Sequence, residues 1–266
     1  MKIIIDTKKT VEQNAAIYFE RAKKARKKTE GAKRAISIAQ LKMDSMTQEQ
    51  RLQEEKKKIV KVERKREWYE KFRWFISSDG FLCIGGRDST TNEIVVKKHS
   101  QKGDIVLHTD MSGSPFIVIK SDGKEIPMAT VEEAAQFCAC YCRAWKLGMA
   151  SLEVFYVAPE QLSKEPNAGE SLPKGAFVVR GSVKYVQPTL ELTIGKALDG
   201  RVITGAQKSV LKHAGSGYTI MQGTDKTSDV AKKLSLLLKA DVDDIVSMLP
   251  SGGVKLGKEV KPHRMM

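Results

Sequence analysis

The sequence lacks long apolar runs and is poor in aromatic residues. Nowhere does it contain the roughly 18 consecutive apolar residues that a membrane-spanning helix requires. Its opening, MKIIID, meets a charged side chain too soon for a secretory signal. We therefore expect a cytoplasmic protein without a membrane partner. Aromatic residues make up only 6% of the chain, which argues against a surface that binds single-stranded nucleic acid by stacking its bases.

Cysteine and histidine are also scarce. Cys138, Cys140 and Cys142 fall in one predicted helix, where alternate positions cannot all face one metal ion, and Cys83 is distant in sequence. We expect small core or surface thiols in a reducing compartment, with no metal and no cofactor. The four histidines are scattered, and neither an HExxH nor a GxSxG motif occurs. An enzyme is therefore not predicted.

Acidic residues are in deficit, mainly at the N-terminal end. Residues 1–73 contain 22 Lys and Arg against 11 Asp and Glu, whereas residues 74–266 contain 24 against 21. The first segment thus carries +11 of the net charge of +14. Such an excess indicates a polyanionic partner, although the charged flanks of a helix can equally be a solvated face.

Within this basic arm, small or apolar residues recur at alternating steps of four and three, the spacing of a coiled-coil seam. The seam consists of Val11, Ala15, Tyr18, Ala22, Ala25, Thr29, Ala32, Ile36 and Ala39. Lys23, Lys24, Lys27 and Lys28 lie off the seam. Their side chains must therefore face solvent or a partner.

The seam pauses over residues 43–47 and a second apolar run follows. Thr47 and Gln50 have the spacing of a capping box, which marks the start of a helix. We therefore predict a turn at 43–47 and an antiparallel helical coiled-coil hairpin over residues 1–72. Its second helix carries two basic clusters as candidates for phosphate contact, Lys56-Lys57-Lys58 and Arg64-Lys65-Arg66.

Residues 73–195 predict an α+β domain in which an antiparallel-rich sheet packs on one main helix. Asp79-Gly80 is expected to form a two-residue hairpin turn. Thr130 and Glu133 are expected to cap the main helix, and Gly148 to end it. A short helix is predicted at 91–99, capped by Thr90. The predicted strands are 74–78, 81–84, 104–109, 116–120, 152–157, 176–180, 182–187 and 190–194.

Residues 196–266 predict a small α/β tail. Strands at 201–204 and 217–221 alternate with helices at 206–213, 227–239 and 241–249, and Pro250 ends the last helix. The final stretch, Ser251–Met266, is rich in glycine and lysine. We expect it to be frayed.

Two segments of the central domain could contact a phosphate. Gly85-Gly86 precedes a short helix and could present backbone N–H groups to an anion, or it could simply form a turn. The run 108–115 (HTDMSGSP) follows a predicted buried strand. It could bind a sugar-phosphate backbone. Alternatively, it could be a loop with a histidine whose hydrogen bonds are made within the protein.

Several separated segments resemble the RNA-binding (NFACT-R) domain of the NFACT family, which includes the bacterial fibronectin-binding-protein-like factors and the eukaryotic nuclear export mediator factor. They occur in the family's order over roughly residues 68–194, as KFRWFISS at 71–78, LCIGGRD at 82–88, GDIVLHTD at 103–110 and KGAFVVRG at 174–181. NAAIYF at 14–19 resembles the opening of the family's coiled-coil hairpin. The chain is similar to a short, stand-alone archaeal-type form that lacks the N-terminal glycosylase-like and helix-hairpin-helix modules.

The resemblance implies a role in ribosome-associated quality control, on large subunits obstructed by a stalled nascent chain. It implies ribosomal RNA or tRNA on the large subunit as the partner. Selection of aminoacyl-tRNA and extension of stalled chains rest, in the family, largely on the N-terminal domain, so we do not carry these activities over.

We therefore expect a non-enzymatic RNA-binding protein that recognises structured RNA by its shape and backbone. The expected contact residues are Lys23, Lys24, Lys27, Lys28, Lys56, Lys57, Lys58, Arg64, Lys65, Arg66, Arg87, Lys97, Lys98, His108 and Arg180. One alternative is a scaffold whose hairpin pairs with a protein partner or with a copy of itself. Another is a nucleic-acid enzyme that uses His108, Asp110 and Arg87.

Overall fold

The computed structural model describes residues 4–58, 66–166, 169 and 171–262, and for 42 and 44–58 it describes the backbone alone. The chain divides into two compact units, Met1–Lys65 and Arg66–Met266. Within the described residues, no helix combines the length and the apolar character needed to cross a bilayer.

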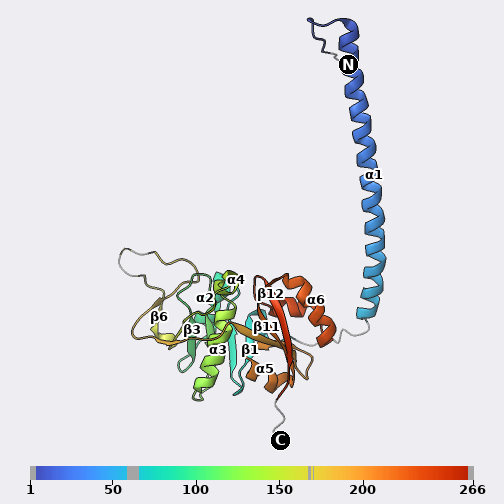
Figure 1. The fold of residues 1–266 in the computed structure, drawn as a ribbon. Coiled ribbons are helices and arrows are strands. Elements are labelled where there is room, and N and C mark those ends of the chain that lie inside the picture. The colour runs from blue at the N-terminus through green and yellow to red at the C-terminus, as the bar shows by residue number, and fades with distance from the viewer. Residues whose placement is uncertain (1–3, 59–65, 167–168, 170, 263–266) are drawn as a thin grey trace. The chain divides into compact units, whose positions relative to one another are not determined.

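The N-terminal unit contains one long helix, α1 (Val11–Lys58), which is uninterrupted in Figure 1. At 48 residues, it is about 72 Å long. The predicted turn at 43–47 is therefore wrong, and with it the hairpin. Residues 43–47 contain neither glycine nor proline, and the Leu, Lys, Gln and Glu residues around them favour helix. A motif typical of helix starts is therefore not enough to interrupt α1 here.

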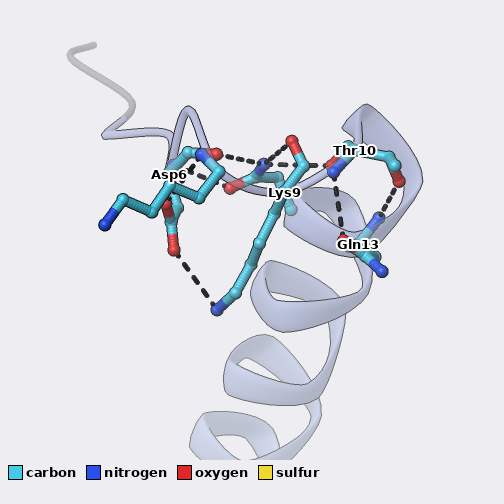
Figure 2. A network of polar contacts seen from close by, with 6 residues as sticks. Asp6, Lys9, Thr10 and Gln13 are labelled. Atoms are coloured by element: carbon cyan, nitrogen blue, oxygen red, sulfur yellow. Dashed lines mark hydrogen bonds and ion pairs between the residues drawn. The ribbon is translucent and has the colours of Figure 1, made fainter.

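A short N-terminal segment folds back on the first turns of α1 and caps it (Figure 2). The Gln13 N–H donates to Thr10 Oγ1 over 3.3 Å, and the Thr10 N–H donates to Gln13 Oε1 over 3.1 Å, a reciprocal capping box. Buried Asn14 donates to the carbonyl oxygens of Asp6, Lys9 and Thr10. These bonds satisfy polar backbone groups at the helix start.

The C-terminal unit is built on a six-stranded, wholly antiparallel sheet with the order β1-β2-β4-β3-β5-β8. Its strands are β1 (Arg73–Ile76), β2 (Leu82–Gly85), β3 (Ile105–His108), β4 (Ile117–Ile119), β5 (Val154–Val157) and β8 (Lys184–Val186). A separate pair joins β6 (Leu162–Ser163) to β7 (Val178–Val179). The antiparallel-rich α+β prediction is confirmed.

Helices and short 3₁₀ turns complete this part of the unit. They are η1 (Trp68–Lys71), α2 (Ser89–His99), α3 (Met128–Cys140), α4 (Arg143–Leu147) and η2 (Pro159–Gln161). The predicted main helix is split, because Tyr141 and Cys142 leave helical geometry before α4 begins. Gly148 ends α4 in the left-handed conformation (φ +67°), as predicted. The core contains Trp74 and Trp145, which are 1% and 2% exposed.

Three local predictions in this region are wrong. Thr130 and Glu133 do not cap the main helix, because α3 already begins at Met128 with Pro127 as its N-cap. The β1–β2 connection is longer than two residues, since the Ser77 N–H donates to the Phe81 carbonyl oxygen around a turn that needs Gly80 at φ +89°. Helix α2 is capped by Asp88 instead of Thr90, because the Asp88 carboxylate accepts from the Thr91 N–H at 2.8 Å. Aspartate, like threonine, can accept a hydrogen bond from an otherwise unpaired N–H group in the first turn of a helix.

A second, four-stranded antiparallel sheet has the order β10-β9-β11-β12. It consists of β9 (Glu191–Lys196), β10 (Val202–Gly205), β11 (Gly217–Asp225) and β12 (Val254–Val260), with α5 (Gln207–Ala214), α6 (Thr227–Leu238) and α7 (Val242–Met248). The strand predicted at 190–194 as the last of the central sheet is instead a central strand of this one. The predicted small α/β tail is therefore antiparallel.

The frayed end predicted for Ser251–Met266 is wrong for residues 254–260, because there β12 pairs with β11. Residues 263–266 of this prediction lie outside the described residues. Glycine was the misleading signal. A Cβ at Gly257 would lie 2.9 Å from the Thr219 Cβ, so the residue marks close strand packing and not flexibility.

Candidate nucleic-acid interface

A cavity of about 470 Å³ lies in the unit Arg66–Met266. Three segments wall it: the start of α2 from Gly86 to Asn92, the β3–β4 loop from His108 to Phe116, and the stretch from Pro173 to Val179. Arg73, Tyr141 and Phe155 complete the lining. The segments come from distant parts of the sequence, and packing of α2 and the loops on the sheet brings them together.

Buried Asn92 joins the first wall to the second. Its Nδ2 donates to the Ser114 carbonyl oxygen at 3.2 Å, and its Oδ1 accepts from the Phe116 N–H at 3.0 Å. Gly86 allows this close approach, because a Cβ there would lie 2.0 Å from Asn92 Oδ1. The Gly86 N–H itself donates to the Phe116 carbonyl oxygen. Gly85 ends β2, so the pair is not a turn, and the Gly86 N–H is engaged and not free to bind a phosphate.

The second wall holds a neutral histidine. His108 Nε2 donates to the Ser114 carbonyl oxygen at 3.2 Å, and the ring stacks on Phe116 with 3.9 Å between centroids. Burial lowers the pKa of His108 to about 4. At neutral pH this residue therefore adds no positive charge, and it positions the loop. Thr109 and Ser114 are joined through their hydroxyl groups, and Gly113 has φ +86°.

The third wall is tied to α2 through Glu93. Its Oε2 accepts from the Gly175 N–H and from Lys164 Nζ, each at 3.3 Å, and its Oε1 pairs with Lys97 Nζ at 2.7 Å. The hydrogen bond from Lys97 is the main reason why the pKa of Glu93 falls to about 2. Gly175 has φ +81°, and a Cβ there would lie 2.5 Å from the Ser89 carbonyl oxygen.

Two arginines at the cavity form the strongest electrostatic feature of the site. The Arg73 guanidinium lies over the Tyr141 ring at 4.2 Å. Among the described residues, the Arg73 side chain has no hydrogen-bond or ion-pair partner. Arg87 donates to the carbonyl oxygens of Ser247 and Phe72, each at 3.1 Å. Burial lowers the pKa of both arginines, and the charge of Arg87 lowers that of Arg73 further. No carboxylate in the described chain makes an ion pair with either.

The acidic residues of the lining are Asp88 and Asp110. The Asp88 carboxylate accepts from the Thr91 N–H and hydroxyl at 2.8 and 3.0 Å, so it is engaged in capping α2. Asp110 is exposed. Lys174 is exposed at the same cavity and lowers the pKa of Asp88 slightly, after the hydrogen bonds from Thr91.

Of the fifteen residues expected to contact RNA, the cavity lining contains Arg87 and His108. It also contains Gly86 and most of the predicted run 108–115, including Asp110. Lys97 is paired with Glu93, Lys98 is exposed on the last turn of α2, and Arg180 lies 3.5 Å from a carboxylate oxygen of Glu165. Lys23, Lys24, Lys27 and Lys28 are exposed on α1, and Arg66 is exposed at the start of the second unit. Lys56, Lys57 and Lys58 end α1, but their side chains, like Arg64 and Lys65, are outside the described set.

Arg73, Lys174 and Phe177 are candidate residues that the sequence analysis did not single out. Arg73 begins the otherwise apolar strand β1, and Lys174 and Phe177 lie in a loop, so neither charge clustering nor motif spacing marks them. The only sequence feature that could have marked them is their position in the segments KFRWFISS and KGAFVVRG, which carried the family resemblance.

The cysteines take no part in this site as reactive groups. All four are free and buried. Burial raises the pKa of Cys83, Cys138 and Cys140 well above the usual value and raises that of Cys142 too. They are core thiols, one of the two options that the sequence left open.

Comparison with known proteins identifies the domain that contains this cavity. Residues 71–181 match the model of the NFACT protein RNA-binding domain. The chain carries the RNA-binding domain of the NFACT family. All the cavity-lining residues from Arg73 to Val179 fall inside this NFACT domain.

Curated relatives extend the similarity beyond the NFACT domain. The chain is 42% identical over 206 residues to the archaeal Rqc2 homolog aRqcH of Methanocaldococcus jannaschii, covering 75% of this chain and 31% of that protein. It is 37% and 36% identical to the ribosome quality control complex subunit NEMF of Homo sapiens and Mus musculus, over 66% of this chain and 16% of each relative. The chain therefore spans less than a third of the length of these relatives.

Proposed function

We propose that this chain is a non-enzymatic RNA-binding protein of ribosome quality control, which contacts ribosomal RNA or tRNA on the large ribosomal subunit in the cytoplasm. One observation carries the proposal. The matched RNA-binding domain holds two arginines at a cavity, half-buried Arg73 and Arg87, which is held by hydrogen bonds to carbonyl oxygens. Neither makes an ion pair with a carboxylate of the described residues. Phosphate oxygens would complete the hydrogen bonding of such guanidinium groups.

The N-terminal unit would add affinity that does not depend on sequence. Lys23, Lys24, Lys27 and Lys28 are exposed on α1, and exposed lysines neutralise backbone phosphates and release condensed counterions. We propose that these residues, with Arg66, Lys98, Arg180 and the clusters at 56–58 and 64–65, contact the RNA backbone. A rigid helix can follow a folded RNA over a distance that the cavity alone cannot span.

The groups at the cavity support binding better than catalysis. The ring of His108 is neutral, and its Nε2 hydrogen donates to a backbone carbonyl oxygen, so it is poorly placed to take a proton from a substrate. The described residues contain no group of three or more His, Cys, Asp or Glu that could hold a metal ion. The combination of His108, Asp110 and Arg87 as a reactive cluster therefore has little support.

Binding to RNA can be tested with the purified full chain, a purified tRNA and isolated large ribosomal subunits over a salt series. We expect affinity to fall steeply with salt, and the slope to decrease by about 0.7–0.9 for each phosphate contact removed. Arg73→Gln with Arg87→Gln, and the four α1 lysines changed to Gln, should each weaken binding. The matched control is Lys232→Gln with Lys233→Gln on α6, both exposed. Equal affinity and slope in all variants would contradict the proposal.

A second candidate function, a protein-interaction scaffold, is favoured by the apolar side chains that α1 exposes. The seam residues Val11, Tyr18 and Ile36 are 82%, 37% and 63% exposed, although a coiled-coil seam is stable only when a second helix covers it. Sedimentation of the full chain tests this function. A dimer that persists at high salt and is lost in the variant Val11→Ser with Ile36→Ser would support it, whereas a monomer at all salt concentrations would exclude self-pairing.

A further inference from the structure

We propose that the cavity of the NFACT domain takes a single unpaired nucleotide of a folded RNA. Its phosphate would lie on Arg73, Arg87 and Lys174, and its base against Phe155 and Phe177. The inference rests on the proposed RNA-binding function and specifies which part of an RNA the cavity takes.

The size of the cavity suits one nucleotide. Its volume of about 470 Å³ is within the range of about 300–1,000 Å³ that is usual for sites of small organic ligands. A base-paired stem is far wider, so it can only lie across the opening. A nucleotide that is bulged or looped out of a stem can enter the cavity while the stem remains outside.

Charge determines where the phosphate would go. Each guanidinium has five N–H donors. Those of Arg73 have no hydrogen-bond partner in the described chain, and Arg87 uses two of its donors on carbonyl oxygens. The two like charges repel each other where water is partly excluded. A phosphate that bridges them would relieve this repulsion and accept several charge-assisted hydrogen bonds.

Aromatic residues determine where the base would go. Phe155 and Phe177 line the same cavity as the arginines. Phe177 is half-buried, and its ring is held edge-to-face on Phe116 at 5.2 Å with Lys164 Nζ 4.4 Å from its centroid. A ring fixed in this way loses little freedom when a base packs on it. Stacking is tolerant of base identity, so we infer no preference for one base.

Free carboxylates could also satisfy the arginine pair. A peptide that ends in a free carboxylate would use the two guanidinium groups but would bring no flat ring to the aromatic wall. The combination of two arginines with two phenylalanines favours a nucleotide, in which an anion and a flat aromatic group are linked at a fixed distance.

The test uses the full chain and two RNA hairpins that differ only in one bulged 2-aminopurine nucleotide, which is present in the first and absent in the second. We expect the bulged hairpin to bind about five- to 150-fold more tightly, the contribution of one stacked base. Its fluorescence should be quenched on binding as the base stacks. Phe177→Ser should abolish both effects while leaving the affinity for the fully paired hairpin within about twofold of wild type.

Lys174→Gln keeps the test valid if the Arg73 and Arg87 variants fail to fold, because Lys174 is exposed and substitution should not disturb the core. It should reduce the preference for the bulged hairpin, whereas its control, Lys232→Gln at an exposed position of α6, should leave the preference unchanged. The inference is wrong if the bulged and paired hairpins bind equally, or if their affinity ratio is the same in Lys174→Gln, Phe177→Ser and wild type. In that case general RNA binding would still stand.

Two competition experiments distinguish a nucleotide within an RNA from a free mononucleotide and from a peptide carboxylate as the ligand of the cavity. 5′-AMP should displace the bulged nucleotide only at concentrations far above those at which the hairpin binds, because it lacks the contacts of the stem. If 5′-AMP binds as tightly as the hairpin, the cavity is a site for free mononucleotides and the inference fails. It also fails if an acidic peptide with a free C-terminus displaces the hairpin more effectively than 5′-AMP does. If neither hairpin binds at all, the proposed function fails as well.

Discussion

The buried ion pair between Asp104 and Lys120 allows a quantitative test of how the central sheet is held together. Asp104 directly precedes β3, Lys120 directly follows β4, and their side chains are 2% and 11% exposed. Asp104 also accepts hydrogen bonds from the Gln101 N–H at 2.9 Å, the Ser121 N–H at 2.8 Å and the Ser121 hydroxyl at 3.1 Å. Asp104 is therefore held by several donors, whereas no other acceptor near Lys120 is recorded in the described chain.

This asymmetry predicts unequal costs for removing the two charges. Asp104→Asn leaves a buried ammonium group facing an amide, and it should lower the free energy of unfolding by about 3–5 kcal/mol. For a unit of this size, that corresponds to a fall in Tm of about 6–20 °C. Lys120→Met leaves a carboxylate with three remaining donors. Its cost should be smaller by about 1.5 kcal/mol or more, the value of one hydrogen bond to a charged group.

Tryptophan fluorescence during urea unfolding of the full chain measures both costs. The three tryptophans, at 68, 74 and 145, all belong to the unit Arg66–Met266, so melting of α1 does not contribute. Asp122→Asn is the matched control, because Asp122 is exposed in the neighbouring turn and asparagine tolerates its φ of +47°; its effect should stay within about 0.5 kcal/mol. Equal destabilisation by Asp104→Asn and Lys120→Met would refute the reasoning.

Three further predictions concern the cavity and the core. Gly86→Ala should destabilise the unit by about 1–3 kcal/mol, because two of the three atoms that its Cβ would meet, at 2.6 and 2.8 Å, are backbone atoms of Asn92; a urea midpoint equal to that of wild type would contradict this. His108 titrates at about pH 4 when folded and at about 6.5 when unfolded, so the unfolded state binds the extra proton and stability should fall as pH drops from 6.5 to 4, by at most about 1.4 kcal/mol per pH unit. His108→Gln should flatten this part of the stability profile, and an unchanged slope would show that other groups cause it. All four cysteines are buried, so a thiol reagent should label none of them in the native chain and all four in denaturant; fast labelling of any one in the native chain would refute the packing.

The sequence predicted the elements of the second unit well because their patterns are local. Short runs of apolar, β-branched and aromatic residues marked β1 to β5, and Gly148 was correctly placed at the end of a helix. Errors arose where one residue type serves two purposes. Glycine indicated flexibility at Ser251–Met266, although Gly257 permits close strand packing. The capping-box spacing at Thr47 indicated a helix start, although the same residues are tolerated inside α1.

The site was less accessible to sequence reasoning than the fold. Charge clustering selected lysines of α1 and α2, which lie outside the cavity, because solvent-exposed cations are the commonest kind. Arg73 and Phe177 become interesting only when the fold brings β1 and the 173–179 stretch to one cavity. His108 was correctly selected as a cavity residue, but its burial against Phe116 changes its role from a cation to a positioning group.

The hydrogen bonds that Arg87 and Tyr141 donate to α7 have a consequence for the order in which the site forms during synthesis. Arg87 donates to the carbonyl oxygen of Ser247, 160 positions later in the chain. The ring of Tyr141 lies under Arg73, and its hydroxyl donates to the carbonyl oxygen of Met248. During synthesis, both arginines are therefore made well before the residues of α7 that anchor them. A nascent chain that has not yet reached α7 would hold its guanidinium groups loosely, and full competence would arrive only as α7 docks.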